Sequence, residues 1–153
     1  MTLFTIRDFV RESNRIEGIV REPTDVEIAA HEKFSLLYGI SIGNMEAFVN
    51  EIEPGGRLRD QDGLDVRVGG HIPPRGGRAI RTLLTELLEK SCHLMWPVSP
   101  YRVHLKYELL HPFTDGNGRS GRVLWLWMMG GIEKAPLGFL HHFYYQALAA
   151  SDR

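Results

Sequence analysis

The chain of 153 residues has 43% hydrophobic and 24% charged residues, which suits one folded domain with a proper hydrophobic core and argues against a disordered chain. Eighteen Lys and Arg residues against nineteen Asp and Glu residues give a formal charge of -1, so binding to nucleic acid through phosphate neutralisation is not expected. The longest strongly apolar run, residues 123–129, is too short to cross a bilayer, and the charged start of the chain is unlike a signal peptide. With Cys92 as the single cysteine, a disulfide framework is excluded, and we expect a cytoplasmic protein that binds neither membrane nor nucleic acid.

Helical spacing dominates the first third of the chain. A helix is predicted over residues 24–38, where Thr24 and Glu27 have the spacing of a capping box. A shorter helix is predicted over residues 42–52, with Ser41 as its cap, because a proline and two glycines follow it. The apolar face expected on the first of these helices consists of Val26, Ala29, Ala30, Phe34 and Leu37.

Residues 57–77 differ from their surroundings because five glycines and two prolines lie among them. The alternation over residues 64–68, after the turn signal Asp62-Gly63, predicts a two-stranded flap or hairpin. An irregular surface loop fits the spacing equally well. Strands this short would need support from the helices.

The second half of the chain again has helical spacing. Helices are predicted over residues 78–95, from Ser99-Pro100 onward, around the wholly apolar run 123–129, and from Pro136 to about Ala149. We therefore expect an all-α fold, a compact helical bundle with one short β-hairpin flap. The apolar positions expected in the core of the first two of these helices are Ile80, Leu83, Leu84, Leu87, Leu88, Cys92, Val103, Tyr107 and Leu110.

The segment 111–122 (HPFTDGNGRSGR) combines features of an anion-binding site. Pro112 disfavours helix at His111, so a helix should end at Leu110, and the Asp-Gly-Asn-Gly run then supplies a tight loop. The next helix should begin near Asn117 or Gly118. Its first amides lack intrahelical partners and lie at the positive end of the helix dipole, which is favourable for a phosphate.

The side chains of this segment fit a nucleotide polyphosphate. Arg119 and Arg122 are three residues apart at the helix start, and two guanidinium groups suit several phosphates better than one. Asp115 is an oxygen ligand suited to a phosphate-bound Mg²⁺, and His111 is a base near neutral pH. Taken one at a time, these residues are more often caps, turns or solvated surface. Together they favour transfer from a nucleotide to a hydroxyl group.

The same segment resembles the signature of the Fic family, His-x-Phe-x-(Asp/Glu)-Gly-Asn-Gly-Arg-x-x-Arg, at every specified position. The resemblance extends upstream, where His104, Tyr107, Glu108 and Leu110 are similar to the helix that leads into the family's motif. Residues 66–74 (VRVGGHIPP) are similar to the family's flap. The helical pattern of the chain agrees with the Fic fold.

The resemblance implies a protein adenylyltransferase, which moves AMP from ATP to a Ser, Thr or Tyr hydroxyl of a target protein. His111 would be the catalytic base and Asp115 would hold Mg²⁺. Arg122 would hold the γ-phosphate. The remaining nucleotide-binding positions that the resemblance implies are Gly116, Asn117, Gly118 and Arg119.

The resemblance also implies that the flap receives the target protein as an added strand. The flap residues are Val66, Arg67, Val68, Gly69, Gly70 and His71. Nothing in them identifies the target, and self-modification of a Tyr or Ser is compatible with the sequence. Phe113 is expected to anchor the loop in the core. The oligomeric state is left open.

The segment 13–18 resembles the family's inhibitory motif, (Ser/Thr)-x-x-x-Glu-(Gly/Asn), at Ser13, Glu17 and Gly18. Glu17 could pair with Arg122, and an arginine bound to a carboxylate cannot hold a γ-phosphate. An ordinary helix end with Gly18 as its stop is the alternative. Residues 1–22 would thus be an inhibitory segment, and residues 23–153 a single catalytic core.

Other functions remain compatible with these residues. The same scaffold resembles proteins that remove AMP or that transfer phosphate or another nucleotide. A non-catalytic nucleotide-binding module of toxin–antitoxin type is a further alternative. ATP labelled at the α- or γ-phosphate would distinguish the enzymatic cases.

Overall fold

The computed structural model describes residues 4–92 and 98–135 of the chain. The regular structure in these ranges is helical, so the predicted all-α fold is confirmed. The helices are α1 (Ile6–Ile16), α2 (Asp25–Ser35), α3 (Ile42–Ile52), α4 (Arg78–Ser91), α5 (Pro100–Leu110) and α6 (Asn117–Met128).

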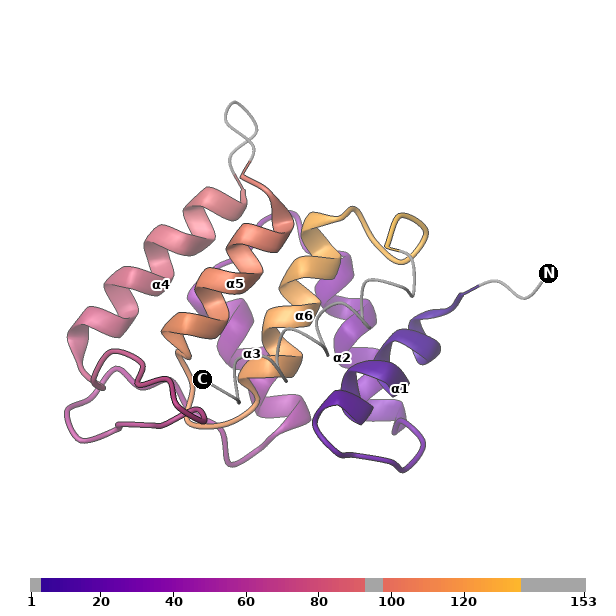
Figure 1. The fold of residues 1–153 in the computed structure, drawn as a ribbon. Coiled ribbons are helices and arrows are strands. Elements are labelled where there is room, and N and C mark those ends of the chain that lie inside the picture. Colours follow the sequence, from indigo (N-terminus) through magenta and orange to yellow (C-terminus); the bar gives the residue numbers. More distant parts are fainter. Residues whose placement is uncertain (1–3, 93–97, 136–153) are drawn as a thin grey trace.

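Helix α6 lies in the middle of the bundle (Figure 1). It packs against α1, α2, α3 and α5, whereas α4 lies on the outside against α3 and α5. The central position explains why α6 is apolar on all sides after its first two turns, as the sequence predicted. Val123, Leu124 and Leu126 have no exposed surface. The start of α6, which carries the Fic-like motif, is thereby fixed by the core of the protein.

Local sequence signals position the first three helices. The capping boxes predicted for the Thr24 helix and the Ser41 helix are both present, and α3 has the predicted bounds. A third capping box joins Thr5 and Asp8 at the start of α1. The predicted apolar face of α2 was partly wrong, because Val26 is 58% exposed and Ala29 is also exposed.

Polar side chains take the place of those residues in the buried face of α2. Glu27 and His31 are buried there together with Ala30 and Phe34. Glu27 accepts hydrogen bonds from Arg21 Nη2 (2.8 Å) and from Asn14 Nδ2 (3.3 Å), which tie α2 to the segment around α1. A carboxylate that is fully paired can occupy a position which periodicity assigns to an apolar residue.

The predicted flap contains less β-structure than expected. Within residues 57–77 the described pairing consists of isolated bridges, Leu58 with Phe113 and Val68 with His71, so the alternation over 64–68 does not form a strand. The Val68–His71 bridge closes a tight turn around Gly69 and Gly70. Two adjacent prolines, at positions 73 and 74, lack the amide hydrogens that a longer ladder needs.

The predictions for the second half of the chain are confirmed for α4, α5 and α6 within the described residues. Leu83 is 41% exposed, whereas the other apolar positions predicted for α4 and α5 are buried or half-buried. The helix predicted over residues 78–95 ends earlier, at Ser91, with Cys92 as its C-cap. Residues 93–95 and the helix predicted from Pro136 lie outside the described residues. In the described ranges we find no helix with the length and apolar character to span a membrane.

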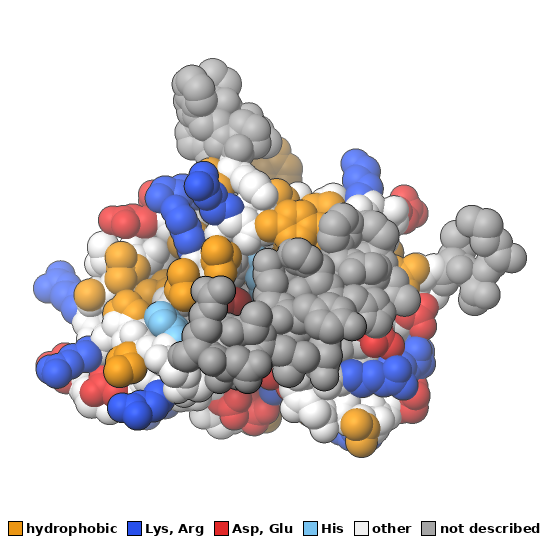
Figure 2. Space-filling model, viewed as in Figure 1, with side chains coloured by type: hydrophobic (Ala, Val, Ile, Leu, Met, Phe, Trp, Pro, Cys, Tyr) orange, Lys and Arg blue, Asp and Glu red, His pale blue; other side chains and the backbone are white. Residues whose placement is uncertain are grey.

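Basic and acidic side chains are interspersed on the face shown in Figure 2, in keeping with a formal charge of -1. Hydrophobic side chains gather on the same face over α4 and α5. Leu83, Leu105 and Leu109 are large hydrophobic residues of these two helices whose side chains are exposed.

Candidate functional site

The loop between α5 and α6 begins with an unusual backbone at His111. Helix α5 ends at Leu110, and His111 follows in the left-handed conformation with φ 50°. Among the described residues, His111 is the one non-glycine residue with a positive φ. This conformation costs a residue with a β-carbon roughly 1–2 kcal/mol. The loop must therefore be held by its surroundings, as is common for residues at functional sites.

Asn117 closes this loop on itself. Its side-chain oxygen accepts a hydrogen bond from Phe113 N (2.8 Å), and its Nδ2 donates to Phe113 O (2.7 Å). Phe113 is 1% exposed within the core, in agreement with its expected role as an anchor. Because the side chain of Asn117 is buried and bonded to Phe113, we expect Asn117 to meet a ligand through its backbone N–H.

Helix α6 presents unpaired amides at its start. Gly116 has φ +80°, a conformation suited to glycine, and precedes the helix as its N-cap. The first intrahelical bond runs from Ser120 N to Gly116 O (3.0 Å), so the amides of Asn117, Gly118 and Arg119 lack intrahelical acceptors. The exposed Asp115 precedes them, and its Oδ1 accepts from Gly116 N (2.8 Å).

The carboxylate of Glu17 lies at this helix start. Its Oε1 accepts a hydrogen bond from Arg122 Nη2 (2.7 Å), and a β-carbon on Gly118 would collide with the same oxygen. Ser13 adds two contacts to the same guanidinium, through its Oγ to Nε (2.8 Å) and through its carbonyl to Nη2 (2.9 Å). The structure thus brings the residues of both motifs together, with an anionic group beside the amides where the sequence predicted an anion.

Gly18 has φ +77°, directly after Glu17, the residue that caps α1. This left-handed glycine ends the helix, as in the ordinary interpretation of the segment. The two interpretations of residues 13–18 are therefore compatible, because the same helix end that needs the glycine also directs Glu17 toward Arg122.

Arg119 differs from Arg122 in its surroundings. Its Nη2 donates to Glu53 Oε2 (2.7 Å) and its Nη1 to Ile52 O (3.2 Å), both at the end of α3. The Arg119 side chain is 5% exposed. The guanidinium therefore joins α6 to α3, and sequence reasoning missed Glu53 because a contact across 66 residues leaves no local signal.

A cavity of about 350 Å³ opens at the start of α6. It joins His111 and the loop before α6 to Glu17 at the end of α1. The flap residues 66–71 do not line it, although His71 Nε2 lies 2.8 Å from Leu109 O, close to His111 in sequence. Its lining residues are Glu17, Ile19, Glu53, His111, Thr114, Asp115, Gly116, Asn117, Gly118 and Arg119.

Burial shifts the pKa values of several titratable groups in and near this cavity. It lowers the pKa of His111, with the opposing field of the Glu108 carboxylate as a smaller effect. Burial raises the pKa of Glu108, against the attraction of Arg122 and His111. Burial also lowers the pKa of His104 to about 4, so this histidine is neutral at pH 7. A neutral His111 is able to accept a proton at physiological pH.

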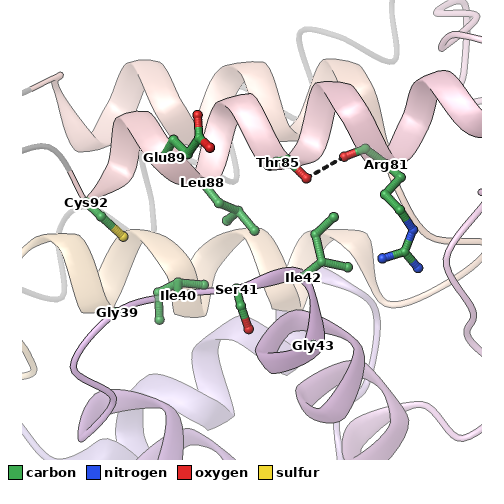
Figure 3. Close-up of a pocket in the computed structure, with 10 residues that line it drawn as sticks. All are labelled: Gly39, Ile40, Ser41, Ile42, Gly43, Arg81, Thr85, Leu88, Glu89 and Cys92. Atoms are coloured by element: carbon green, nitrogen blue, oxygen red, sulfur yellow. Dashed lines mark hydrogen bonds between the residues drawn. The ribbon is translucent and has the colours of Figure 1, made fainter.

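A second, larger cavity of about 630 Å³ lies between α4 and the start of α3 (Figure 3). Ile40, Ile42 and Leu88 point into it, and Arg81 and Thr85 lie toward its other end. None of the predicted site residues lines this cavity. The smaller cavity is lined by Glu17, His111 and residues 115–119, whereas Arg122 does not line it and is joined to it through Glu17. We therefore take the smaller cavity as the candidate active site.

The loop between α5 and α6 carries the complete motif within a helical bundle, and the comparison with known families agrees with it. The Fic/DOC family model matches residues 44–129, more than half of the chain. The chain therefore belongs to the Fic/DOC family.

Curated relatives carry the name protein adenylyltransferase Fic. The chain is 36% identical over 112 residues to that of Aedes aegypti, which covers 68% of this chain and 21% of the relative. It is 42% identical over 82 residues to that of Drosophila melanogaster, which covers 50% of this chain and 15% of the relative. The chain thus spans about a fifth of the length of the curated relatives it matches. No solved structure gives a significant match.

Proposed function

We propose that this chain is a protein adenylyltransferase that transfers AMP from ATP to a Ser, Thr or Tyr hydroxyl of a target protein. The observation that carries the proposal is the cavity at the start of α6, in which His111 faces the same space as the unpaired amides and the motif loop. Membership of the Fic/DOC family and the printed names of the relatives support it.

His111 is the proposed catalytic base. Its Nδ1 is buried, so Nε2 is the nitrogen available to the cavity. Nε2 takes the proton of the target hydroxyl while the hydroxyl oxygen bonds to the α-phosphorus. The bond from the α-phosphorus to the oxygen of the β-phosphate breaks, and pyrophosphate leaves. Removal of the proton at the moment of attack is the usual contribution of a general base.

The helix start is the proposed triphosphate site. The amides of Asn117, Gly118 and Arg119 would donate to phosphate oxygens, and Arg122 would bind the γ-phosphate once it is released from Glu17. Gly116 and Gly118 let the phosphates approach the backbone closely. Arg119, held by Glu53, would contribute its amide and the positive field of its guanidinium.

Mg²⁺ fits this site as an ion that is held mainly by phosphates. The described residues contain no cluster of three or more His, Cys, Asp or Glu side chains that could form a protein cage for a metal. Asp115 lines the cavity, is exposed, and has no ion-pair partner among the described residues. One carboxylate plus substrate phosphates is the usual environment of Mg²⁺, which when bound would neutralise the charge developing on the phosphates.

Autoinhibition is the proposed role of Ser13, Glu17 and Gly18. Glu17 and Ser13 together supply three hydrogen bonds to the Arg122 guanidinium, whose side chain is 4% exposed. The γ-phosphate would need the same guanidinium and the space over Gly118. Binding of ATP in a productive pose therefore competes with the end of α1.

The segment Val68–His71, with Gly69 and Gly70 at its tip, is the proposed docking flap together with Val66 and Arg67. The exposed backbone around this turn could form hydrogen bonds with the backbone of a target segment, which would impose little selectivity on the target's sequence. The neighbouring apolar surface of Ile72, Leu105 and Leu109 is compatible with a protein target.

The experiment that tests the proposal uses Glu17→Gly protein with ATP labelled at the α-phosphate or at the γ-phosphate. We expect the α label in protein, in the chain itself or in a cell lysate, and its loss in Glu17→Gly/His111→Ala. Mass spectrometry should find AMP on the modified residue. Protein labelled only from the γ-phosphate would indicate phosphorylation, and no label with intact ATP binding would indicate a binding module.

Removal of AMP is the second candidate, because Glu17 lines the same cavity as His111 and could orient a water there. An AMP-modified target, produced with Glu17→Gly protein, distinguishes the two. Wild-type protein that releases AMP from it, with Glu17→Gly inactive in this assay, would favour the second candidate.

A further inference from the structure

Arg59 is a completely buried arginine in the connection between α3 and α4. Within the described residues it forms no ion pair, and its guanidinium instead donates four hydrogen bonds to backbone carbonyls. A buried cation without a carboxylate is unusual, because desolvation of the charge must be offset by hydrogen bonds of good geometry. The positions of the four acceptors therefore indicate what this side chain is used for.

Two of the acceptors belong to the turn that carries the candidate base. Nε donates to His111 O (2.6 Å) and Nη2 to Leu110 O (2.9 Å). These carbonyls lie at the end of α5, where the helix dipole favours a cation. The Arg59 backbone adds a bond from its N–H to Pro112 O (2.9 Å), so three successive carbonyls are held by one residue.

The other two acceptors enclose the predicted flap. Nη1 donates to Leu64 O (3.0 Å) and to Pro74 O (2.9 Å). Residues 66–71 lie between these two points. The same planar group thus joins both ends of the flap-bearing loop to the left-handed residue His111.

We propose that Arg59 is a positioning residue, which fixes the backbone of His111 and the flap-bearing loop 64–74 relative to one another. This inference rests on the proposed function of the site. AMP transfer requires the imidazole and the target hydroxyl to be correctly placed relative to each other. Arg59 contacts both the backbone that carries the imidazole and the two ends of the loop proposed to dock the target. Helix α6, which would bind the triphosphate, is held by Asn117, Arg119 and the core instead. Loss of Arg59 should therefore affect turnover and leave ATP binding nearly unchanged.

The test compares Arg59→Lys with Arg57→Lys, both in the Glu17→Gly protein. Lysine keeps the charge and loses the planar donor group that reaches four acceptors. Arg57 is exposed, and its guanidinium contacts only Gln61 among the described residues, so it is a matched control. We expect Arg59→Lys to lower kcat at least tenfold while KM for ATP changes less than twofold, and Arg57→Lys to change neither.

Hydrogen exchange supplies a readout that does not depend on activity. Amides of residues 64–72 and of His111 should exchange at least tenfold faster in Arg59→Lys, whereas the amides of α6 should be unchanged. Unchanged kcat and exchange would overturn the proposal. Loss of ATP binding together with faster exchange in α6 would also overturn it, because that pattern indicates general destabilisation.

Two further outcomes are distinguishable. If Glu17→Gly protein modifies nothing, the proposed function fails, and hydrogen exchange alone decides whether Arg59 holds the two segments. If Arg59→Lys does not fold, Arg59→Gln replaces it, since glutamine retains a planar donor group. If neither variant folds, Arg59 is required for the fold as a whole and the proposal is wrong.

Discussion

The Glu17 carboxylate and the Arg122 guanidinium meet at 2.7 Å, although 105 residues separate them in the chain. The arginine side chain is 4% exposed and the glutamate side chain 37% exposed, so the pair lies at the boundary between the core and the candidate active site. The contact is made at the start of α6, beside the amides that are proposed to bind phosphate. Ser13 holds the same guanidinium from the preceding turn of α1.

Partial release of this arginine should raise activity in steps. Ser13→Ala removes the hydroxyl bond to Arg122 and keeps Glu17, so we expect AMP transfer between that of wild type and that of Glu17→Gly. Glu12 lies on α1 and pairs with Arg15 (3.1 Å), so Glu12→Ala serves as the control and should resemble wild type. Initial rates with α-labelled ATP measure the series. Activity in Ser13→Ala above that in Glu17→Gly would contradict the proposed competition.

The same pair should contribute modestly to stability. Glu17→Gly leaves Arg122 with its Ser13 partners, and the exposure of Glu17 weakens the ion pair, so we expect a loss of about 1–2 kcal/mol. This corresponds to a fall in Tm of roughly 3–6 °C.

ATP with Mg²⁺ should raise the Tm of Glu17→Gly by more than it raises the Tm of wild type, because the ligand replaces the missing anion. Differential scanning fluorimetry at several ATP concentrations measures both effects. An equal response of the two proteins to ATP would show that Glu17 does not compete with the nucleotide.

The pH dependence of AMP transfer should reflect the buried position of His111. Burial disfavours the imidazolium form and lowers the pKa of this histidine below its ordinary value. The neutral base therefore persists as the pH falls, and the acid limb of kcat/KM should lie below pH 6.5. Profiles of Glu17→Gly protein from pH 5 to 8 provide the measurement. An acid limb above pH 7 would exclude His111, in this environment, as the group that titrates.

Stability should fall between neutral pH and pH 4 because of His31. Burial lowers its pKa to about 4, while the unfolded chain titrates near 6.5. Between these values the unfolded state binds a proton that the folded state does not, so stability is full above pH 6.5 and is lost toward pH 4. At pH 5 the expected loss from His31 is about 2 kcal/mol.

Urea unfolding of wild type and His31→Leu at pH 7.5 and pH 5 measures this effect. His31 contacts the rings of Phe9 and Phe48, so leucine keeps an apolar group there. The variant should lose less stability on acidification than wild type. Glu27 adds a separate loss at lower pH: burial alone would raise its pKa, but Arg21 and the Thr24 amide outweigh it and hold it at about 2. Its contribution is present above pH 4.5 and disappears toward pH 2.

Gly121 should not tolerate a larger residue. A β-carbon there would lie 2.9 Å from Tyr107 Cδ1 and 3.1 Å from Glu108 Oε1, so α5 and α6 could not pack as closely. Gly121→Ala should lower the free energy of unfolding by about 1–3 kcal/mol. Gly39→Ala is the matched control, because a β-carbon added at Gly39 would meet nothing within 4 Å, and it should stay within about 0.5 kcal/mol of wild type. Equal free energies of unfolding for both variants would show that α5 can shift at little cost.

Local chemistry made much of the fold predictable. The capping boxes at Thr24 and Ser41, and the prolines at positions 54, 100 and 112, mark helix ends because each acts within a few residues. The amides without intrahelical acceptors at the start of α6 were also predictable, since a glycine-rich loop before a buried helix leaves the first amides of that helix free wherever the helix is placed. By contrast, residues 64–68 alternate like a strand and form none, because pairing depends on a partner elsewhere in the chain.

By itself the sequence determined the helical class, the motif loop from His111 to Arg122 and the hypothesis that Glu17 opposes Arg122. Only the tertiary structure decided that Ser13 shares this arginine, that Glu53 binds Arg119, and that Arg59 joins the supports of His111 and the flap. The physical reason is the distance along the chain over which each kind of interaction acts. Caps and turns depend on neighbours in sequence, whereas a buried charge takes whichever carbonyl or carboxylate the packed helices bring within about 3 Å.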